Sequence, residues 1–226
     1  MLVDLKEMAA REAVKHVKDG MVVGLGSGST ASIAIRFLGD KVKEGWKLVG
    51  VPTSRDSEVL GKSVGITIGE LKDYPDVDLT IDGADEVDPE LNLIKGLGGA
   101  LVREKIVAAA TKIEIIIVDE SKLVGYLGQK APLPVEIVKF ASESTMRRLQ
   151  KFGCVPILRE KNGLAFITDN GNLIADCRFQ RIDNPAKTES DLNLVPGVVD
   201  NGLFIGLTDK VIVASKAGVR TIESRS

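Results

Sequence analysis

Ten residues of this sequence, Val77-Asp78-Leu79-Thr80-Ile81-Asp82-Gly83-Ala84-Asp85-Glu86, join an apolar run to three closely spaced carboxylates. The run predicts a buried strand. Acids at the carboxyl end of such a strand are typical of open α/β sheets, in which ligands bind outside the strand ends. A lysine and a glycine-rich turn follow at Lys95-Gly96-Leu97-Gly98-Gly99, and then Glu104 in a predicted helix. Acids, one lysine and a glycine-rich backbone are the groups needed to move protons on a small polar substrate, so the pattern indicates an enzyme.

Helical and apolar segments alternate along the first half of the chain. Helices are predicted from Asp4 to Gly20 and over residues 30–38, 57–61 and 100–111, with strands at 21–25, 48–51, 77–81 and 113–118. Continuous Val/Ile/Leu runs between amphipathic segments indicate a parallel sheet covered by helices on both faces.

The pattern changes after Lys122, and the two prolines of Ala131-Pro132-Leu133-Pro134 mark a domain boundary. Short strands dominate from residue 135 to 199. Alternation at 164–168 and 173–176 around a turn predicts a hairpin, and helices at 144–151 and 186–194 are expected to cover one face. The apolar segments 203–206 and 211–214 are predicted to rejoin the first sheet.

Composition excludes several classes of protein. A hydrophobic content of 44% and a charged content of 27% fit a globular protein with a sizeable core. The net charge of −2 and the lack of a basic block argue against a nucleic-acid partner. The sequence shows no signal peptide and no apolar run long enough to span a membrane. Two isolated cysteines, Cys154 and Cys177, suit a reducing cytoplasm.

The loop Gly24-Leu25-Gly26-Ser27-Gly28-Ser29-Thr30 stands where the first strand meets a helix. Hydroxyls and helix N-terminal amides there can bind an anion, which favours a phosphate over a simple glycine turn without a ligand. A dinucleotide fingerprint requires a third glycine where Ser29 stands and an acid after the second strand, where the chain reads Gly50-Val51-Pro52-Thr53. NAD binding is therefore not expected.

The acids leave three alternatives. Asp82, Asp85 and Glu86 can form a turn with a helix cap, bind a divalent metal, or accept hydrogen bonds from sugar hydroxyls. Lys95 weighs against a metal, because its ammonium competes for the same negative charge. Lys95 itself can be an ordinary surface lysine, and Glu104 an ordinary first-turn glutamate. His16 is the only histidine, so a Ser-His-Asp mechanism has almost no residues to draw on.

The ordered set GLGSGST, TSRDS, DGADE, KGLGGALVREK, DESK, PGVVDNGLF and GVRTI resembles ribose-5-phosphate isomerase of the A type along nearly the whole chain. Ser27 stands where many members of that family carry Thr, and Leu97 stands where a third glycine is frequent.

The resemblance implies interconversion of D-ribose 5-phosphate and D-ribulose 5-phosphate through an enediolate, in the non-oxidative pentose phosphate pathway, without metal or cofactor. The implied fold is a Rossmann-like domain (1–130 and 201–226) with a smaller α+β, ferredoxin-like domain (131–200) built on a four-stranded antiparallel sheet. The implied assembly is a homodimer or homotetramer.

The family's base falls on Glu104. Lys95 would neutralise the enediolate oxygen, and Asp82 and Asp85 would hold hydroxyls or assist ring opening. The substrate-binding segments fall on Ser27, Gly28, Ser29 and Thr30, on Asp82, Gly83, Ala84 and Asp85, on Lys95, Gly96, Leu97 and Gly98, and on Lys122.

Two other functions are alternatives to the isomerase: a sugar-phosphate-sensing module and an acyl-CoA transferase-like enzyme with a catalytic glutamate. Only the isomerase would convert ribose 5-phosphate into a ketose.

Overall fold

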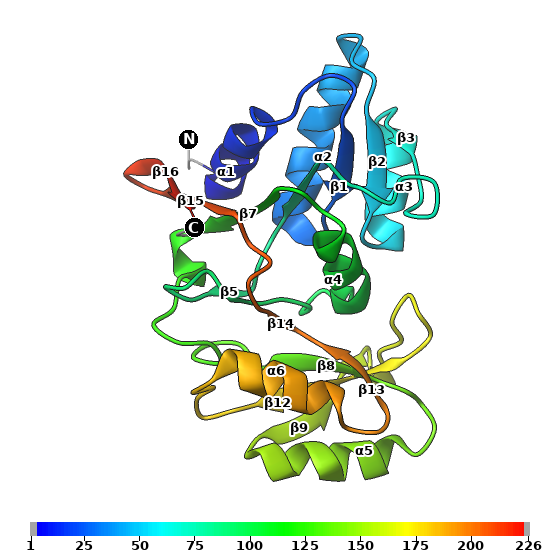
Figure 1. The fold of residues 1–226 in the computed structure, drawn as a ribbon, viewed down its shortest axis with the longest axis vertical. Helices are drawn as coiled ribbons and strands as arrows, with labels where there is room; N and C mark the ends of the chain where they lie inside the picture. The colour runs from blue at the N-terminus through cyan, green and yellow to red at the C-terminus, as the bar shows by residue number, and fades with distance from the viewer. Residues whose placement is uncertain (1–3, 224–226) are drawn as a thin grey trace. The chain divides into compact units, whose positions relative to one another are not determined.

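The computed structural model describes residues 4–223. Its largest sheet has seven strands in the order β16-β15-β7-β4-β1-β2-β3 (Figure 1). Neighbouring strands run parallel except β16, which pairs antiparallel with β15 at the edge. The strands are β1 (Val22–Leu25), β2 (Val49–Pro52), β3 (Thr67–Ile68), β4 (Leu79–Asp82), β7 (Glu114–Asp119), β15 (Lys210–Ser215) and β16 (Gly218–Glu223). The mostly parallel sheet predicted from the apolar runs is confirmed.

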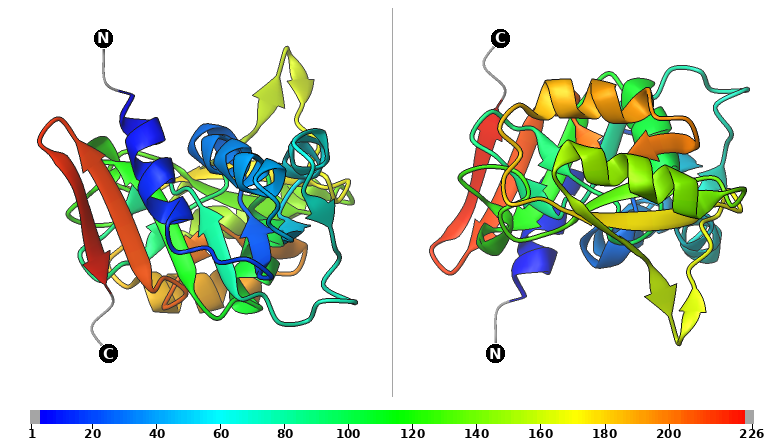
Figure 2. Two further views of the ribbon diagram at one scale, coloured as in Figure 1. Left: turned by 90° about the horizontal axis from the view of Figure 1, so that it is seen from above. Right: turned by 90° about the horizontal axis from the view of Figure 1, so that it is seen from below.

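Helices cover both faces of this sheet. They are α1 (Leu5–Val14), α2 (Gly28–Lys43), α3 (Arg55–Ser63) and α4 (Leu101–Ala109), and the short 3₁₀ helix η1 (Glu120–Lys122) follows β7. Ala9 of α1 and Ile35 of α2 share one core with residues of β1, β4 and β7, such as Ile117. Helix α1 also lies beside β15 and β16 (Figure 2). On the opposite face, Val107 of α4 packs with Val51 and Val77.

The predicted four-stranded antiparallel sheet is also present, in the order β13-β8-β12-β9. Its strands are β8 (Leu133–Ile137), β9 (Val155–Leu158), β12 (Leu173–Arg178) and β13 (Val198–Asn201). The helices α5 (Ser142–Leu149) and α6 (Pro185–Asn193) pack on one face through Leu149 and Leu192, as expected from the sequence, and the 3₁₀ helix η2 (Gln150–Phe152) extends α5 (Figure 2).

Two strand pairings differ from the sequence prediction. Segment 164–165 (β11, Leu164–Ala165) pairs with β10 (Glu160–Lys161), whereas β12 pairs with β8 and β9. The hairpin turn therefore lies at Asn162-Gly163, where Asn162 has a positive φ of 55°. Strand β14 (Leu203–Phe204) pairs with β6 (Leu93–Ile94) and does not join the first sheet, and β6 pairs in turn with β5 (Glu86–Val87).

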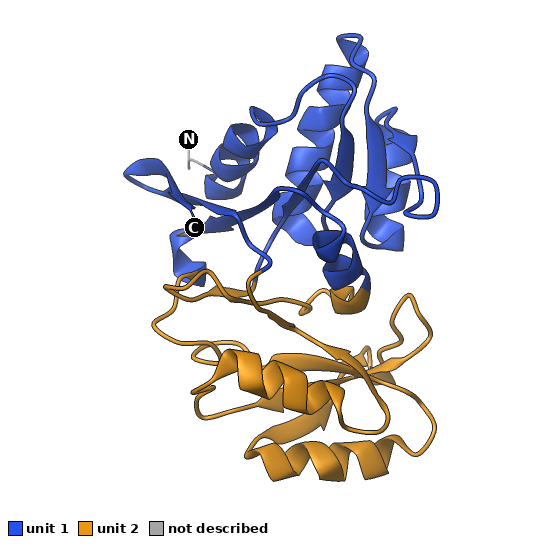
Figure 3. Ribbon diagram, in the orientation of Figure 1, with its two compact units in different colours: residues 1–84, 103–122, 207–226 blue, residues 85–102, 123–206 orange. Residues whose placement is uncertain are grey.

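The chain divides into two compact units (Figure 3). Unit 1 comprises residues 1–84, 103–122 and 207–226, and unit 2 comprises residues 85–102 and 123–206. These bounds differ from the predicted domains chiefly in segment 85–102. The reason is the β5-β6-β14 sheet, which joins this segment to the strand that leaves the antiparallel sheet. Over residues 4–223, no helix is long and apolar enough to cross a membrane.

Candidate active site

Asp82 ends β4 and shapes the phosphate-binding loop predicted in unit 1. Its Oδ1 accepts hydrogen bonds from the backbone N–H groups of Ser27, at 2.9 Å, and Gly83, at 2.7 Å. A Cβ on Gly26 would lie 2.4 Å from Asp82 Oδ1, so this close approach requires glycine. Asp82 thus contacts the Gly26–Thr30 loop, and this contact brings together two of the predicted substrate-binding segments, 27–30 and 82–85.

The hydroxyls of this loop have different partners. The Ser27 hydroxyl is within hydrogen-bonding distance of Thr53 Oγ1, at 2.8 Å, and Ser54 Oγ, at 2.7 Å. Ser27 precedes α2 without capping it through its side chain, and Gly28 and Ser29 are exposed at the helix start. The N–H groups and hydroxyls at Ser29 and Thr30 therefore form the part of the loop that is open to an anion.

A lysine that the sequence analysis did not single out contacts this loop. Lys6 Nζ donates to Ser29 Oγ at 2.9 Å from the first turn of α1. Burial raises the pKa of Asp119, but hydrogen bonds from Ser121 and the charges of Lys122 and Lys6 together bring it below its ordinary value. Lys6 and Lys122 thus contribute positive potential to the same part of unit 1.

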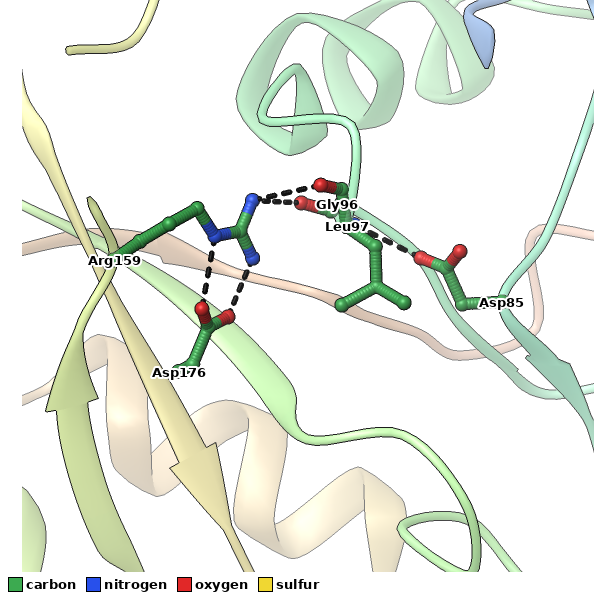
Figure 4. A network of polar contacts seen from close by, with 5 residues as sticks. All are labelled: Asp85, Gly96, Leu97, Arg159 and Asp176. Carbon is green, nitrogen blue, oxygen red and sulfur yellow. Dashed lines mark hydrogen bonds and ion pairs between the residues drawn. The ribbon is translucent and has the colours of Figure 1, made fainter. Parts of the chain in front are cut away.

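The second group of predicted residues lies in unit 2, around the loop after β6. Asp85 Oδ2 accepts the backbone N–H of Leu97 at 2.9 Å (Figure 4). The β5-β6 register pairs Glu86 with Ile94, so one further step sets Asp85 opposite Lys95. The Lys95 ammonium is 5.4 Å from the centroid of the Phe204 ring, and the Lys95 N–H donates to the Gly202 carbonyl at 2.9 Å. Beyond Lys95, Leu97 and Gly98 are exposed.

Glu86, the third carboxylate of the acidic run, has a structural role. Its Oε2 accepts the N–H of Gly128 at 2.6 Å, and its Oε1 accepts the N–H groups of Lys130, at 2.5 Å, and Ala131, at 2.7 Å. Three backbone donors satisfy this fully buried carboxylate, so Glu86 supports the 128–131 loop, a role that none of the three alternatives included.

Glu104 lies in the first turn of α4, on the part of that helix assigned to unit 1. The predicted catalytic groups Asp82, Lys95 and Glu104 are only 1%, 3% and 5% exposed, respectively. Burying a charged side chain costs free energy, so such groups are uncommon outside paired or functional settings. Their burial counts against the reading of Lys95 as a surface lysine and of Glu104 as a solvated helix residue.

The structure thus places the predicted residues in two sets. Unit 1 holds Ser27, Gly28, Ser29, Thr30, Asp82, Gly83, Ala84, Glu104 and Lys122, and unit 2 holds Asp85, Lys95, Gly96, Leu97 and Gly98. Lys6 and Ser54 are additions. Ser54 belongs to the TSRDS segment of the resemblance, which by itself implies no role for it, and Lys6 carries no sequence signal beyond its charge. Within residues 4–223 no three His, Cys, Asp or Glu side chains are grouped to hold a metal ion.

Comparison with known proteins decides the family. The sequence model of ribose 5-phosphate isomerase A (phosphoriboisomerase A) matches residues 49–218. The chain belongs to this family. Ribose-5-phosphate isomerase A of Gloeobacter violaceus is 52% identical over 96% of this chain and 95% of its own length. That of Pyrococcus abyssi is 48% identical over 97% of this chain and 98% of its own length.

Solved structures of the family agree with the fold. Ribose 5-phosphate isomerase A from Methanocaldococcus jannaschii superposes with a TM-score of 0.93 at 45% identity, covering 97% of this chain and 98% of that chain. A D-ribose-5-phosphate isomerase in complex with phospho-erythronic acid has a TM-score of 0.94 at 45% identity and 97% coverage of both chains. The predicted fold class and the predicted aldose-ketose isomerase are confirmed.

Proposed function

We propose that this chain interconverts ribose 5-phosphate and ribulose 5-phosphate with Glu104 as the base that moves the proton between C2 and C1. The burial of Glu104 in the first turn of α4, in a member of this family, carries the proposal. A carboxylate can take the C2 proton of the open-chain aldose and return it to C1 of the enediolate, so one group serves both steps.

The remaining groups support this proton transfer. The Lys95 ammonium stabilises the negative charge that develops on the enediolate oxygen, because it is buried and an opposite charge is strongly felt where water is excluded. Asp85 and Asp82 accept hydrogen bonds from sugar hydroxyls or assist ring opening. Asp82 also holds the Gly26–Thr30 loop in shape through Ser27 and Gly83.

The phosphate binds at the start of α2. Ser29 and Thr30 donate from their hydroxyls and amides, and Lys6 and Lys122 supply positive charge. A related isomerase binds phospho-erythronic acid, which carries a phosphate and a carboxylate. We expect the same compound to bind this chain, and it serves as the probe in the experiments below.

The activity should not require a metal or nicotinamide. After exhaustive dialysis against EDTA, the chain should equilibrate ribose 5-phosphate and ribulose 5-phosphate at an unchanged rate, as followed by ketose formation. The reasons are the ammonium of Lys95, which would compete with a cation for the negative charge of the acids, and the backbone N–H groups that donate to Glu86 and to Asp82 Oδ1. Complete loss of activity that Mg²⁺ or Zn²⁺ restores would instead make the acids metal ligands. An EDTA-insensitive chain that makes no ketose would contradict the isomerase itself.

The phosphate site should respond to Thr30→Val and Lys6→Met. Each change removes one donor to a charged oxygen, which costs about 1.5–3 kcal/mol of binding free energy. Calorimetry with phospho-erythronic acid should therefore show affinity falling roughly tenfold or more. Lys15→Met is the matched control, because Lys15 is the exposed lysine directly after α1 and pairs with Glu12 at 2.7 Å. Unchanged affinity in both site variants would place the phosphate elsewhere.

We also propose that the chain is cytoplasmic and forms a homodimer or homotetramer. The two free cysteines, Cys154 and Cys177, are buried in unit 2, which fits a reducing compartment.

A further inference from the structure

One arginine, directly after a strand of the antiparallel sheet, hydrogen-bonds the loop that follows Lys95. Arg159 stands between β9 and β10, and its Nε donates to Asp176 Oδ2 at 2.9 Å while Nη2 donates to Oδ1 (Figure 4). Its Nη1 donates to two carbonyls of the loop, those of Gly96 and Leu97, both at 2.9 Å. The side chains of Arg159 and Asp176 are 12% and 22% exposed, respectively, so water screens the ion pair between them little. The guanidinium thus joins the sheet to the loop after β6.

The hydrogen bonds form a chain through a single peptide group. The Gly96 carbonyl, which accepts from Arg159, belongs to the same peptide as the Leu97 N–H, which donates to Asp85 Oδ2. This peptide therefore lies between a cation on its oxygen side and an anion on its nitrogen side, as Figure 4 shows. Such an arrangement orients the peptide dipole and strengthens both bonds, because hydrogen bonds in a chain polarise one another.

The far end of the loop is held by the same region. Gly99 has φ +87°, and a Cβ there would lie 2.4 Å from the Phe166 ring. The guanidinium carbon of Arg159 is in turn 5.8 Å from the centroid of that ring. Asp176 faces away from the helix-covered core, because its neighbours Ala175 and Cys177 point into that core. Arg159 thus holds the loop at Gly96 and Leu97, and the Phe166 ring lies so close to Gly99 that no side chain fits between them.

We propose that Arg159 is a positioning residue for the isomerase, acting through the Gly96–Leu97 peptide to fix Lys95 and Asp85 relative to each other. The inference rests on the proposed function, in which Lys95 and Asp85 contact the sugar. The hydrogen bonds from Arg159 to the Gly96 and Leu97 carbonyls form a clamp. Removing the clamp allows the glycine-rich loop to move, and a displacement of about 1 Å in the groups that contact the sugar costs roughly 10²-fold in rate.

A set of variants separates positioning from a purely structural ion pair. Arg159→Met removes the hydrogen bonds to the loop but also leaves the partly buried Asp176 carboxylate without its cation. The double variant Arg159→Met with Asp176→Leu removes the clamp without that carboxylate. Arg159→Lys keeps a positive charge for Asp176 but lacks the planar fork that reaches both carbonyls. Arg178→Met is the control, because Arg178 is an exposed arginine on β12, two residues from Asp176.

We expect kcat to fall roughly 10²-fold in Arg159→Met and in the double variant, with KM within about threefold of the unmutated chain. Arg178→Met should stay within about twofold. Amide exchange at Leu97 should accelerate at least about tenfold in the Arg159 variants, while the amides of β12 keep their protection. Arg159→Lys should show the same pattern and decides the matter if the other two do not fold.

A double variant with nearly full kcat would overturn the proposal, since it would show that Arg159 acts only by neutralising Asp176. Unchanged exchange at Leu97 would overturn it as well. An unmutated chain that forms no ketose would instead refute the isomerase, and the exchange measurement would still report whether Arg159 holds the loop.

Discussion

Glu104→Gln should lower kcat by about 10²–10⁴-fold, the range typical of positioned acid–base catalysis. The amide keeps the size of the side chain and its hydrogen-bonding capacity but cannot accept the C2 proton. Substrate binding should change little, so KM and the affinity for phospho-erythronic acid should stay within a few-fold. Steady-state kinetics with ribose 5-phosphate, together with calorimetry, measures both quantities.

Glu143→Gln is the matched control for this substitution. Glu143 also lies in the first turn of a helix, α5, but it is exposed. Both substitutions remove a charge that interacts favourably with the helix dipole, worth about 0.3–1 kcal/mol at an exposed position, so only Glu104→Gln should change the rate strongly. During turnover in deuterium oxide, the unmutated chain should place solvent deuterium at C1 of the product, unless the shuttled proton is shielded from water. A Glu104→Gln variant within a few-fold of full activity, beside an inactive Asp82→Asn variant, would transfer the base role to Asp82.

The large sheet could be predicted from the sequence because each of its main strands is marked by a signal within a few consecutive residues. Apolar runs such as 113–118 mark buried parallel strands, and the acids after Ile81 mark a strand end where a site forms. Short strands carry much less information. Leu203-Phe204 is too brief to reveal its partner, and it pairs with β6 through contacts that span more than a hundred residues. The 173–176 segment follows a turn signal and is predicted to pair with 164–168, but tertiary packing places it between β8 and β9.

The site residues show the same contrast between local sequence signals and contacts with residues far along the chain. Asp82, Lys95 and Glu104 stand in motifs with recognisable spacing, whereas the roles of Glu86, Lys6 and Arg159 depend on partners far along the chain. Glu86 belongs to the acidic run by sequence, yet its carboxylate is filled by amides 42 to 45 residues away. Arg159 reaches carbonyls 62 and 63 residues away. No local pattern reports such contacts, because the backbone amides that donate to Glu86 and the carbonyls that accept from Arg159 have no side-chain identity.

Lys95→Met should lower kcat by about 10²–10³-fold, the cost of removing one group that stabilises developing negative charge. The thioether retains much of the apolar stem that packs beneath the ammonium near Phe204, so the fold should persist.

Removing a buried ammonium also removes its desolvation cost, and the melting temperature should not fall by more than a few degrees. Lys139→Met is the control, because Lys139 is exposed in the same unit. Lys95→Arg keeps the charge but not the compact ammonium, and it should recover only part of the rate. A Lys95→Met variant within about fivefold of full kcat would mean that another group carries the enediolate charge, since an ammonium placed for that purpose cannot be removed without raising the barrier.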